Sequence, residues 1–300
     1  MKKYRLYQVD AFTDKKFSGN PAGVVPDASG LTEGQMQTIA RELNNSETAF
    51  VFPPDAGDHD VHVRFFTPTV EVPTCGHATV AAHFVRAMEL NLDKVTVKHK
   101  CGIGVLDIHI DKTSGKYVIR MDQPVLGIGN EISADEKRRV LGALGISAGD
   151  LDERCPLHVV DTGNNKLIVG LKSRALLNSL TPDFKSLADL GHHFNCSGFF
   201  IFTLDSDDPA VYTHCRMFGP QIGIPEDPVT GNGNGPLGVY LALHGLVGIE
   251  NGKASFRSRQ GEAMERPGEI DVEVVLENET PVGVSVSGSA VVAFTTELEI

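Results

Sequence analysis

Three separated segments of the chain hold side chains suited to proton transfer. Glu47 opens an apolar run, His77 stands between a glycine and an apolar stretch, and Asp227 precedes a proline and a glycine-rich segment. A carboxylate partly removed from water suits a group that must both accept and return a proton. Histidine is the side chain that changes charge nearest neutral pH. We therefore expect Glu47 to act as general acid/base, His77 as a donor or proton shuttle, and Asp227 as a catalytic or substrate-binding group.

Each of these candidates also has a purely structural interpretation. Glu47 would then be a surface glutamate at a strand edge, His77 a helix-capping or core histidine, and Asp227 a cap of the turn after it. Asn20, between a glycine and a proline, is a candidate substrate contact, although Asn-Pro is also an ordinary turn signal. Cys75 is expected at a helix N-terminus, where its thiol either takes part in binding and chemistry or only packs.

Two glycine-rich turns precede apolar stretches, at residues 78–90 and 236–247. A turn that begins a helix exposes backbone N–H groups at the positive end of the helix dipole, equivalent to about +0.5 charge. Two such ends aimed at one cavity would bind a carboxylate or a developing oxyanion, although tight turns favour glycine in any case. With Asn20, the candidate substrate-binding residues are Cys75, Gly76, Thr230, Gly231, Asn232 and Gly233.

The second turn also contains the dinucleotide-binding pattern G-x-G-x-x-G, at residues 233–238. A true fingerprint follows a strand within a βαβ unit and is followed by an acidic residue about 20 positions later. Here the pattern follows a proline-rich segment deep in the second half of the chain. We therefore reject a nucleotide cofactor on this basis.

The two turns belong to a longer internal repeat with an offset of about 150 to 155 residues. Matching positions in the two halves are Asn45 and Asn195, Phe50 and Phe200, Phe52 and Phe202, Arg64 and Arg216, and Pro68 and Pro220. On this match Ser197 is the counterpart of Glu47. The repeat predicts two halves, residues 1–120 and 121–284, with the active site in the cleft between them. The final strand, within residues 285–300, is a candidate to return to the first half.

Each half is expected to combine strands with a central helix. Residues 49–52 and 62–66 have the composition of short strands. Residues 79–90 and 237–247 are apolar around most of a helix, which is typical of a helix wrapped by a sheet. Amphipathic helices are expected at residues 32–43, with Thr32 as cap, and at 133–144. The predicted fold class is α+β, with two duplicated halves.

Composition excludes several classes of partner. The chain has 300 residues and a formal charge of -12, which disfavours nucleic acid and anionic membranes. Its beginning alternates polar and apolar residues, unlike a secretion signal, and no apolar run reaches bilayer length, so a cytoplasmic protein is expected. The five cysteines lack a Cys-x-x-Cys pair, and the histidines lack neighbouring ligands at metal-binding spacing. We expect neither disulfides nor a metal.

Five motifs together resemble the PhzF family of phenazine biosynthesis, and most of all its YddE-type members. In chain order they are Gly-Asn-Pro-Ala-Gly-Val-Val at 19–25, Ser-Glu-Thr-Ala-Phe at 46–50, Phe-Thr-Pro at 66–68, Cys-Gly-His-Ala-Thr at 75–79 and Glu-Asp-Pro-Val-Thr-Gly at 226–231. The resemblance implies the diaminopimelate-epimerase-like fold, in which each of two similar halves is a curved sheet around a central helix. It also implies that the protein is an isomerase without metal or organic cofactor.

In the phenazine enzymes, the glutamate of the Ser-Glu-Thr motif moves a proton on a dihydro-hydroxyanthranilate. The resemblance assigns that role to Glu47, and the other pocket positions to His77, Asp227 and Asn232. Phenazine-type members carry serine at the position of Asn232, so the resemblance gives only a small carboxylate substrate, cyclic or open-chain. Related proteins are often homodimers, and the same assembly is expected here.

Two other functions stay open. Epimerases of this fold use two opposed cysteines, one from each glycine turn, but here Cys75 precedes Gly76 whereas Thr230 precedes Gly231. A hydroxyl is a much weaker acid than a thiol, which disfavours a symmetric two-thiol racemase or epimerase. A catalytically silent small-molecule-binding protein would keep the same pocket residues without the chemistry.

Overall fold

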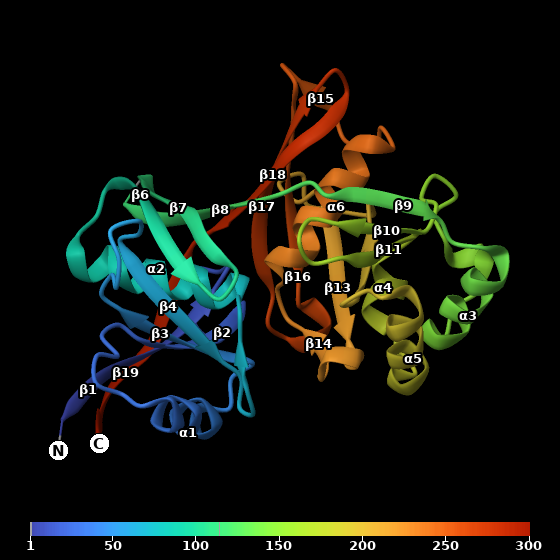
Figure 1. Cartoon of the computed structure of the whole chain (residues 1–300). Helices are drawn as coiled ribbons and strands as arrows, with labels where there is room; N and C mark the ends of the chain where they lie inside the picture. Colours follow the sequence, from blue (N-terminus) through green and yellow to red (C-terminus); the bar gives the residue numbers. More distant parts are fainter. Residues whose placement is uncertain (1, 114) are drawn as a thin grey trace. The chain divides into compact units, whose positions relative to one another are not determined.

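The computed structural model describes residues 2–113 and 115–300, and these form two compact units. Unit 1 consists of the residues up to Asp122 together with Ser287–Ile300, and unit 2 of Gln123–Val286. Figure 1 shows the two units coloured along the chain, with the last strand, β19, among the strands of unit 1. No helix in these described ranges is long and apolar enough to cross a membrane.

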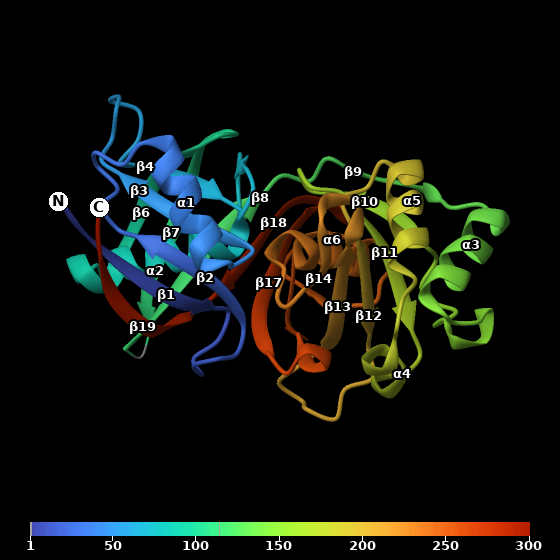
Figure 2. The same ribbon diagram turned by 90° about the horizontal axis from the view of Figure 1, so that it is seen from below.

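Unit 1 is a curved sheet with one helix enclosed by it and another on its outside (Figure 2). Going through the sheet, β19–β1 and β1–β2 are antiparallel, β2–β3 parallel, β3–β4 antiparallel, β4–β6 parallel, and β6–β7 and β7–β8 antiparallel. The elements are β1 (Lys3–Ala11), β2 (Asn20–Val25), α1 (Glu33–Leu43), β3 (Glu47–Phe52), β4 (Val61–Phe66), β5 (Glu71–Val72), α2 (Gly76–Leu90), β6 (Lys94–Cys101), β7 (Gly104–Thr113), β8 (Lys116–Gln123) and β19 (Ala290–Glu299).

Unit 2 repeats this arrangement and adds outer helices. Its strands pair as β9–β10 and β10–β11 antiparallel, β11–β12 parallel, β12–β13 antiparallel, β13–β16 parallel and β16–β17 antiparallel. The elements are β9 (Gly127–Glu131), α3 (Ala134–Leu144), β10 (His158–Asp161), β11 (Lys166–Leu171), α4 (Arg174–Ser179), α5 (Phe184–Phe194), β12 (Phe199–Thr203), β13 (Thr213–Gly219), β14 (Ile224–Asp227), α6 (Gly231–Leu243), β15 (Ile249–Glu250), β16 (Lys253–Gln260), β17 (Gly268–Glu277) and β18 (Thr280–Gly288), with 3-10 helices at Ala148–Asp150, Pro220–Ile222 and Glu262–Met264.

The two units therefore share one sequence of pairings: antiparallel, antiparallel, parallel, antiparallel, parallel, antiparallel. Each parallel pair is joined by a crossover that contains a helix, as parallel pairing requires. In both units a buried helix follows the fifth shared strand, which is β4 in unit 1 and β13 in unit 2, and the structure confirms the predicted α+β class with duplicated halves.

The strand register shifts the sequence match between the halves by one residue. Phe50 lies opposite Arg64 in unit 1, whereas Arg216 lies opposite Ile201 in unit 2, and not opposite Phe200. Since the two arginines hold matching places in the repeat, Phe50 corresponds to Ile201. Both strands are buried on both faces, so hydrophobicity alone does not fix their register.

The turns before these strands show the same shift of one residue between the two halves. Helix α1 ends at Asn44 and helix α5 at Asn195, both in the left-handed conformation, with φ of 52° and 47°. Counting from these caps, Glu47 corresponds to Gly198, and Ser197 corresponds to the residue before Glu47. The expected match of Glu47 with Ser197 is therefore wrong.

The two central helices begin earlier than their apolar patterns indicate. Helix α2 starts at Gly76 rather than at residue 79, and α6 covers Gly231–Leu243 rather than 237–247. The glycine-rich segment of α6 is helical because it packs closely: a Cβ at Gly233 would lie 2.3 Å from the Phe200 ring. The helix ends at Leu243 because Gly245 has a φ of 62°, which ordinary residues rarely adopt.

The outer helices α1 and α3 begin where the sequence indicated, and Thr32 is the cap that was predicted. Thr32 and Ser133 each accept a hydrogen bond from the third helical residue, whose side chain bonds back to the cap, forming capping boxes on α1 and α3. Replacing such a cap by alanine typically costs about 1 kcal/mol. The inner face of α1 packs Met36, Ile39 and Ala40 into the core of unit 1. All five cysteines are buried, and among the described residues none forms a disulfide bond.

Two buried histidines connect the central helix of unit 1 to its sheet. His83 Nε2 of α2 lies 2.9 Å from His99 Nδ1 of β6, and the His99 ring stacks on Phe65. The outer ring nitrogens, His83 Nδ1 and His99 Nε2, have no partner among the described residues. Burial lowers the pKa of His99 to about 4, and burial together with the charges of His99 and Arg86 lowers the pKa of His83 well below its ordinary value.

We predict that this pair makes the fold sensitive to acid. Between pH 6.5 and 4 the unfolded chain binds more protons than the folded chain, so stability falls as the pH falls through this window. The shift of His99 alone corresponds to roughly 3 kcal/mol. Urea unfolding at pH 6.5, 5.5 and 4.5 should show this loss, and the double substitution His83→Leu/His99→Leu should reduce it.

The double substitution removes both partners, so neither ring is left with an unmet hydrogen bond. His192→Gln, at an exposed position of α5, is the matched control and should keep the wild-type dependence on pH. An equal loss of stability in wild type and double variant would contradict the prediction.

Candidate active site

Glu47 and His77 meet in unit 1, from segments that are distant in the sequence. Glu47 is the first residue of β3 and is buried, with only 9% of its surface exposed. His77 is the second residue of α2 and is also buried. Glu47 Oε2 lies 3.4 Å from His77 Nε2. The same nitrogen lies 3.3 Å from the hydroxyl of Ser46.

The N-terminus of α2 brings the thiol of Cys75 to the same place. Cys75 is the N-cap of the helix in extended conformation, and its side chain makes no capping hydrogen bond. Its sulfur lies 3.5 Å from His77 Nδ1. The carbonyl of Cys75 accepts hydrogen bonds from the N–H and the hydroxyl of Thr79, at 3.0 and 2.7 Å, which fix the first helical turn.

Glu47, Cys75 and His77 each offer one ligand atom, and these atoms lie within 4.8 Å of one another. One oxygen, one sulfur and one imidazole nitrogen could hold a zinc ion, which accepts all three atom types. His77 is the common neighbour of the other two, at 3.4 Å from the Glu47 carboxylate and 3.5 Å from the Cys75 sulfur. The structure thus identifies in the described residues a possible metal cluster that spacing in the sequence did not reveal.

Asp227 lies in unit 2, at the end of β14 and just before α6. Its carboxylate accepts a hydrogen bond from the hydroxyl of Thr230, the N-cap of α6. The side-chain amide of Gln260 donates to the Asp227 carbonyl at 2.9 Å and to the Thr230 hydroxyl at 3.1 Å. These bonds hold both side chains in fixed orientations at the start of the helix.

The other candidates lie in the first turn of α6 or at the beginning of β2. Gly231 and Gly233 form the buried first turn of α6, and Asn232 is partly exposed there. The side-chain amide of Gln123 lies 3.3 Å from both the Gly231 carbonyl and Asn232 Oδ1. Asn20 is buried at the beginning of β2.

The sequence did not predict that Lys166 is buried. It opens β11 and only 1% of its surface is exposed. Its ammonium donates hydrogen bonds to Asn164 Oδ1 and, at 2.7 Å, to Ser197 Oγ. The available signal was a lysine leading the run Lys-Leu-Ile-Val-Gly-Leu, which is buried throughout. Fully buried lysines are rare without a strong reason.

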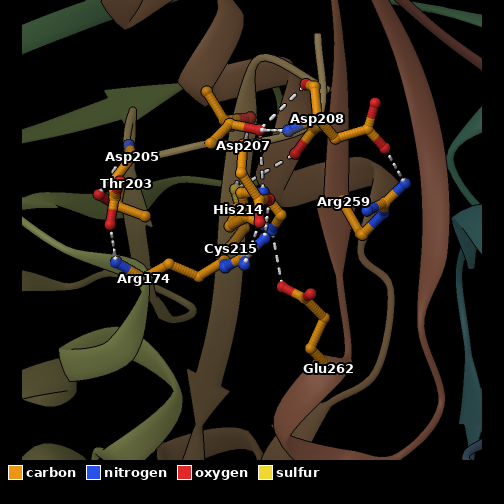
Figure 3. Close-up of polar contacts among 12 residues, drawn as sticks. Arg174, Thr203, Asp205, Asp207, Asp208, His214, Cys215, Arg259 and Glu262 are labelled. Atoms are coloured by element: carbon orange, nitrogen blue, oxygen red, sulfur yellow. Dashed lines mark hydrogen bonds and ion pairs between the residues drawn. The ribbon is translucent and has the colours of Figure 1, made fainter. Parts of the chain in front are cut away.

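A second polar cluster in unit 2 surrounds the buried His214 (Figure 3). His214 Nδ1 lies 2.6 Å from Glu262 Oε2, and His214 Nε2 lies 3.2 Å from Ser206 Oγ. The hydrogen bond with His214 lowers the pKa of Glu262. Ser206 also accepts from the N–H of Asp208 at 3.3 Å, and Arg259 holds the Asp208 carboxylate at 2.8 Å. Because the serine is tied into its own turn, this cluster anchors the β12–β13 loop.

Comparison with known proteins finds similarity over nearly the whole chain. Residues 9–296 match the family described as phenazine biosynthesis-like protein (PhzC-PhzF). An isomerase of Clostridium acetobutylicum is 49% identical over 298 residues, and the isomerase YddE of Escherichia coli is 41% identical over 298 residues; each match covers 99% of both chains. The trans-2,3-dihydro-3-hydroxyanthranilate isomerase of Pseudomonas chlororaphis is 32% identical over 270 residues, covering 85% of this chain and 89% of the relative.

Solved structures give the same answer. The crystal structure of a PhzF-family protein of Bacillus anthracis has a TM-score of 0.89 and 30% identity, and the match covers 100% of both chains. A hydroxyproline epimerase of Agrobacterium vitis has a TM-score of 0.61 at 12% identity, covering 99% of this chain and 92% of that chain, and shares the fold alone. The fold is thus the diaminopimelate-epimerase-like fold that the motifs indicated. Since the match is continuous in sequence and in structure, the chain belongs to the PhzF family of phenazine biosynthesis-like isomerases.

Proposed function

We propose that this isomerase needs no cofactor and transfers a proton on a small amino or hydroxy carboxylate, with Glu47 as the general acid/base. The observation that carries the proposal is the buried contact of Glu47 Oε2 with His77 Nε2, at 3.4 Å. A carboxylate in a poorly hydrated site is a competent base toward carbon acids. A neighbouring imidazole keeps it oriented and shares its proton.

In the proposed reaction Glu47 removes a proton from a substrate carbon, so that a C–H bond breaks and a carboxyl O–H bond forms. The electron pair moves into the conjugated system of the substrate. Glu47 then returns the proton to a different carbon, which regenerates the carboxylate and completes the isomerisation. Backbone N–H groups in the first turn of α2, beside Glu47, are suited to stabilise the negative charge that develops between these two steps.

Asp227, Thr230 and Asn232 are proposed to bind the substrate. Asp227 is held by Thr230, and Gln260 holds both, so the group is rigid before any ligand arrives. Rigid polar groups lose little conformational entropy on binding. The identity to the Pseudomonas chlororaphis isomerase supports a compound chemically similar to trans-2,3-dihydro-3-hydroxyanthranilate.

The main alternative is a racemase or epimerase that uses Cys75. Its thiol is close enough to His77 to exchange a proton, at 3.5 Å. Such enzymes need an acid and a base on opposite faces of one carbon. The matching position before Gly231 holds Thr230, whose hydroxyl is already bonded to Asp227. A hydroxyl in that position is a poor partner for a thiol-based exchange.

The first prediction from the proposed function concerns Glu47. With a panel of cyclic and open-chain amino and hydroxy carboxylates in heavy water, wild-type protein should introduce deuterium into at least one compound, as followed by NMR. Glu47→Gln should slow this exchange by about 10²–10⁴-fold, the usual contribution of a general acid/base. Glu42→Gln, at an exposed position of α1, is the control and should keep the wild-type rate. Full exchange by Glu47→Gln would eliminate Glu47 as the base.

The second prediction distinguishes Glu47 from Cys75 as the residue that transfers the proton. Cys75→Ala should keep the exchange rate within about tenfold of wild type, because the thiol is proposed to pack beside the site rather than transfer the proton. The same NMR assay measures it. Exchange that is lost in Cys75→Ala but retained in Glu47→Gln would assign the chemistry to the thiol and favour the epimerase.

The third prediction tests whether the cluster of Glu47, Cys75 and His77 acts through a metal. Protein dialysed against a chelator should keep its exchange rate, and added Zn²⁺ should lower it, because the ion would occupy the carboxylate that must accept the proton. Metal analysis of the purified protein accompanies the rates. Activity that disappears with the chelator and returns with Zn²⁺ would make the cluster a metal centre.

A further inference from the structure

Lys166 lies in unit 2 beside the position that corresponds to Glu47 in unit 1. In the parallel pair β2–β3, Ala22 lies beside Glu47. In the parallel pair β11–β12, Leu167 lies beside Phe199, which puts Lys166 beside Gly198, the counterpart of Glu47. Laterally paired residues project to the same face of a sheet. In each unit one member of the pair is small and the other carries a charge, but the two strands have exchanged these roles.

The packing at Gly198 shows how this exchange is accommodated. A Cβ built on Gly198 would lie 3.2 Å from Lys166 Cδ and 2.7 Å from Met217 Cε. A side chain at this position would therefore displace the stem of Lys166. The absence of a side chain at Gly198 lets the lysine cross the strand and reach Ser197. The arrangement puts an ammonium where the other repeat has a carboxylate.

The ammonium has neutral partners. Asn164 and Ser197 accept its hydrogen bonds, while the charges of Asp227 and Asp161 only partly offset the effect of burial. Burying a charge without a counter-ion costs several kcal/mol. Asn164 and Ser197 are themselves partly exposed, so the positive charge lies directly beneath two surface groups. An anion bound at that surface would compensate the charge.

We propose that Lys166 is a positioning residue that makes the surface formed by Asn164 and Ser197 selective for the carboxylate of the substrate. The inference rests on the proposed function and deepens it, because it assigns the binding of the anionic group to a particular part of unit 2. Lys166 acts through the two side chains that it holds. It sets their orientation, and its charge favours an anion over a neutral group of equal size.

Solution pH should modulate this selectivity. Burial lowers the pKa of Lys166 to about 8, while the facing groups Cys196, Asp227 and Asp161 counteract part of that effect. As the pH rises through this value the ammonium loses its proton, and the attraction for a carboxylate disappears. The preference for an anion should therefore be present at pH 7 and lost by pH 9.5.

The test compares anthranilate with its neutral isostere 2-aminobenzamide, two stable probes whose fluorescence is easily followed because the protein has no tryptophan. Wild type should bind anthranilate about tenfold more tightly than the amide at pH 7, as one uncompensated charge at short range allows. Lys166→Met should reduce the ratio of the two dissociation constants to about one and make it independent of pH. Lys172→Met, which removes an exposed charge just after the same strand, should behave like wild type.

Ser197→Ala provides a second measurement that does not depend on the folding of Lys166→Met. It removes one group through which the lysine acts, so the preference for the carboxylate should fall while binding of the amide changes less than twofold. A wild type without preference, or a Lys166→Met variant that keeps it, would overturn the proposal. Deuterium exchange is measured separately, so a failure of the Glu47 chemistry would be recognised as a different result.

Discussion

The contact between the Glu47 carboxylate and the His77 imidazole depends on two backbone features of unit 1. Strand β3 starts at Glu47, immediately after the left-handed turn that ends α1. Helix α2 starts at Gly76, so its first turn presents His77 beside that strand end. Neither side chain has freedom to move far, since both are buried. The geometry of this contact is therefore a consequence of where a strand and a helix begin.

Duplication explains why a second such place exists, and divergence explains why it holds different residues. Strand pairing in unit 2 preserves the positions, but Gly198 replaces the glutamate and Lys166 crosses from the neighbouring strand. The helix N-terminus is also preserved, with Thr230 in place of Cys75. An acid in one repeat and a cation in the other suit different tasks. Proton transfer needs the first, and recognition of an anion needs the second.

Local signals allowed much of this to be predicted from the sequence. Thr32 is predictable as a cap and Ser133 as the start of a helix because a capping residue and its partner are only three positions apart. The central helices were recognised by their apolar composition, but the start of α6 was misplaced. Its glycines have low helix propensity, and close packing against Phe200 and other side chains outweighs that preference. The family resemblance placed Glu47, His77 and Asp227, but no pattern gave the distance between Glu47 and His77.

Register and burial were the features that could not be predicted. Phe50 was matched to Phe200 by residue type, although pairing across the sheet makes Ile201 its counterpart. Strands that are apolar at every position give no alternation from which to read the register. The burial of Lys166 could not be predicted either, because a single lysine before an apolar run is usually exposed to solvent. Its burial depends on the missing side chain of Gly198, a residue that is distant in sequence and adjacent only after the sheet has formed.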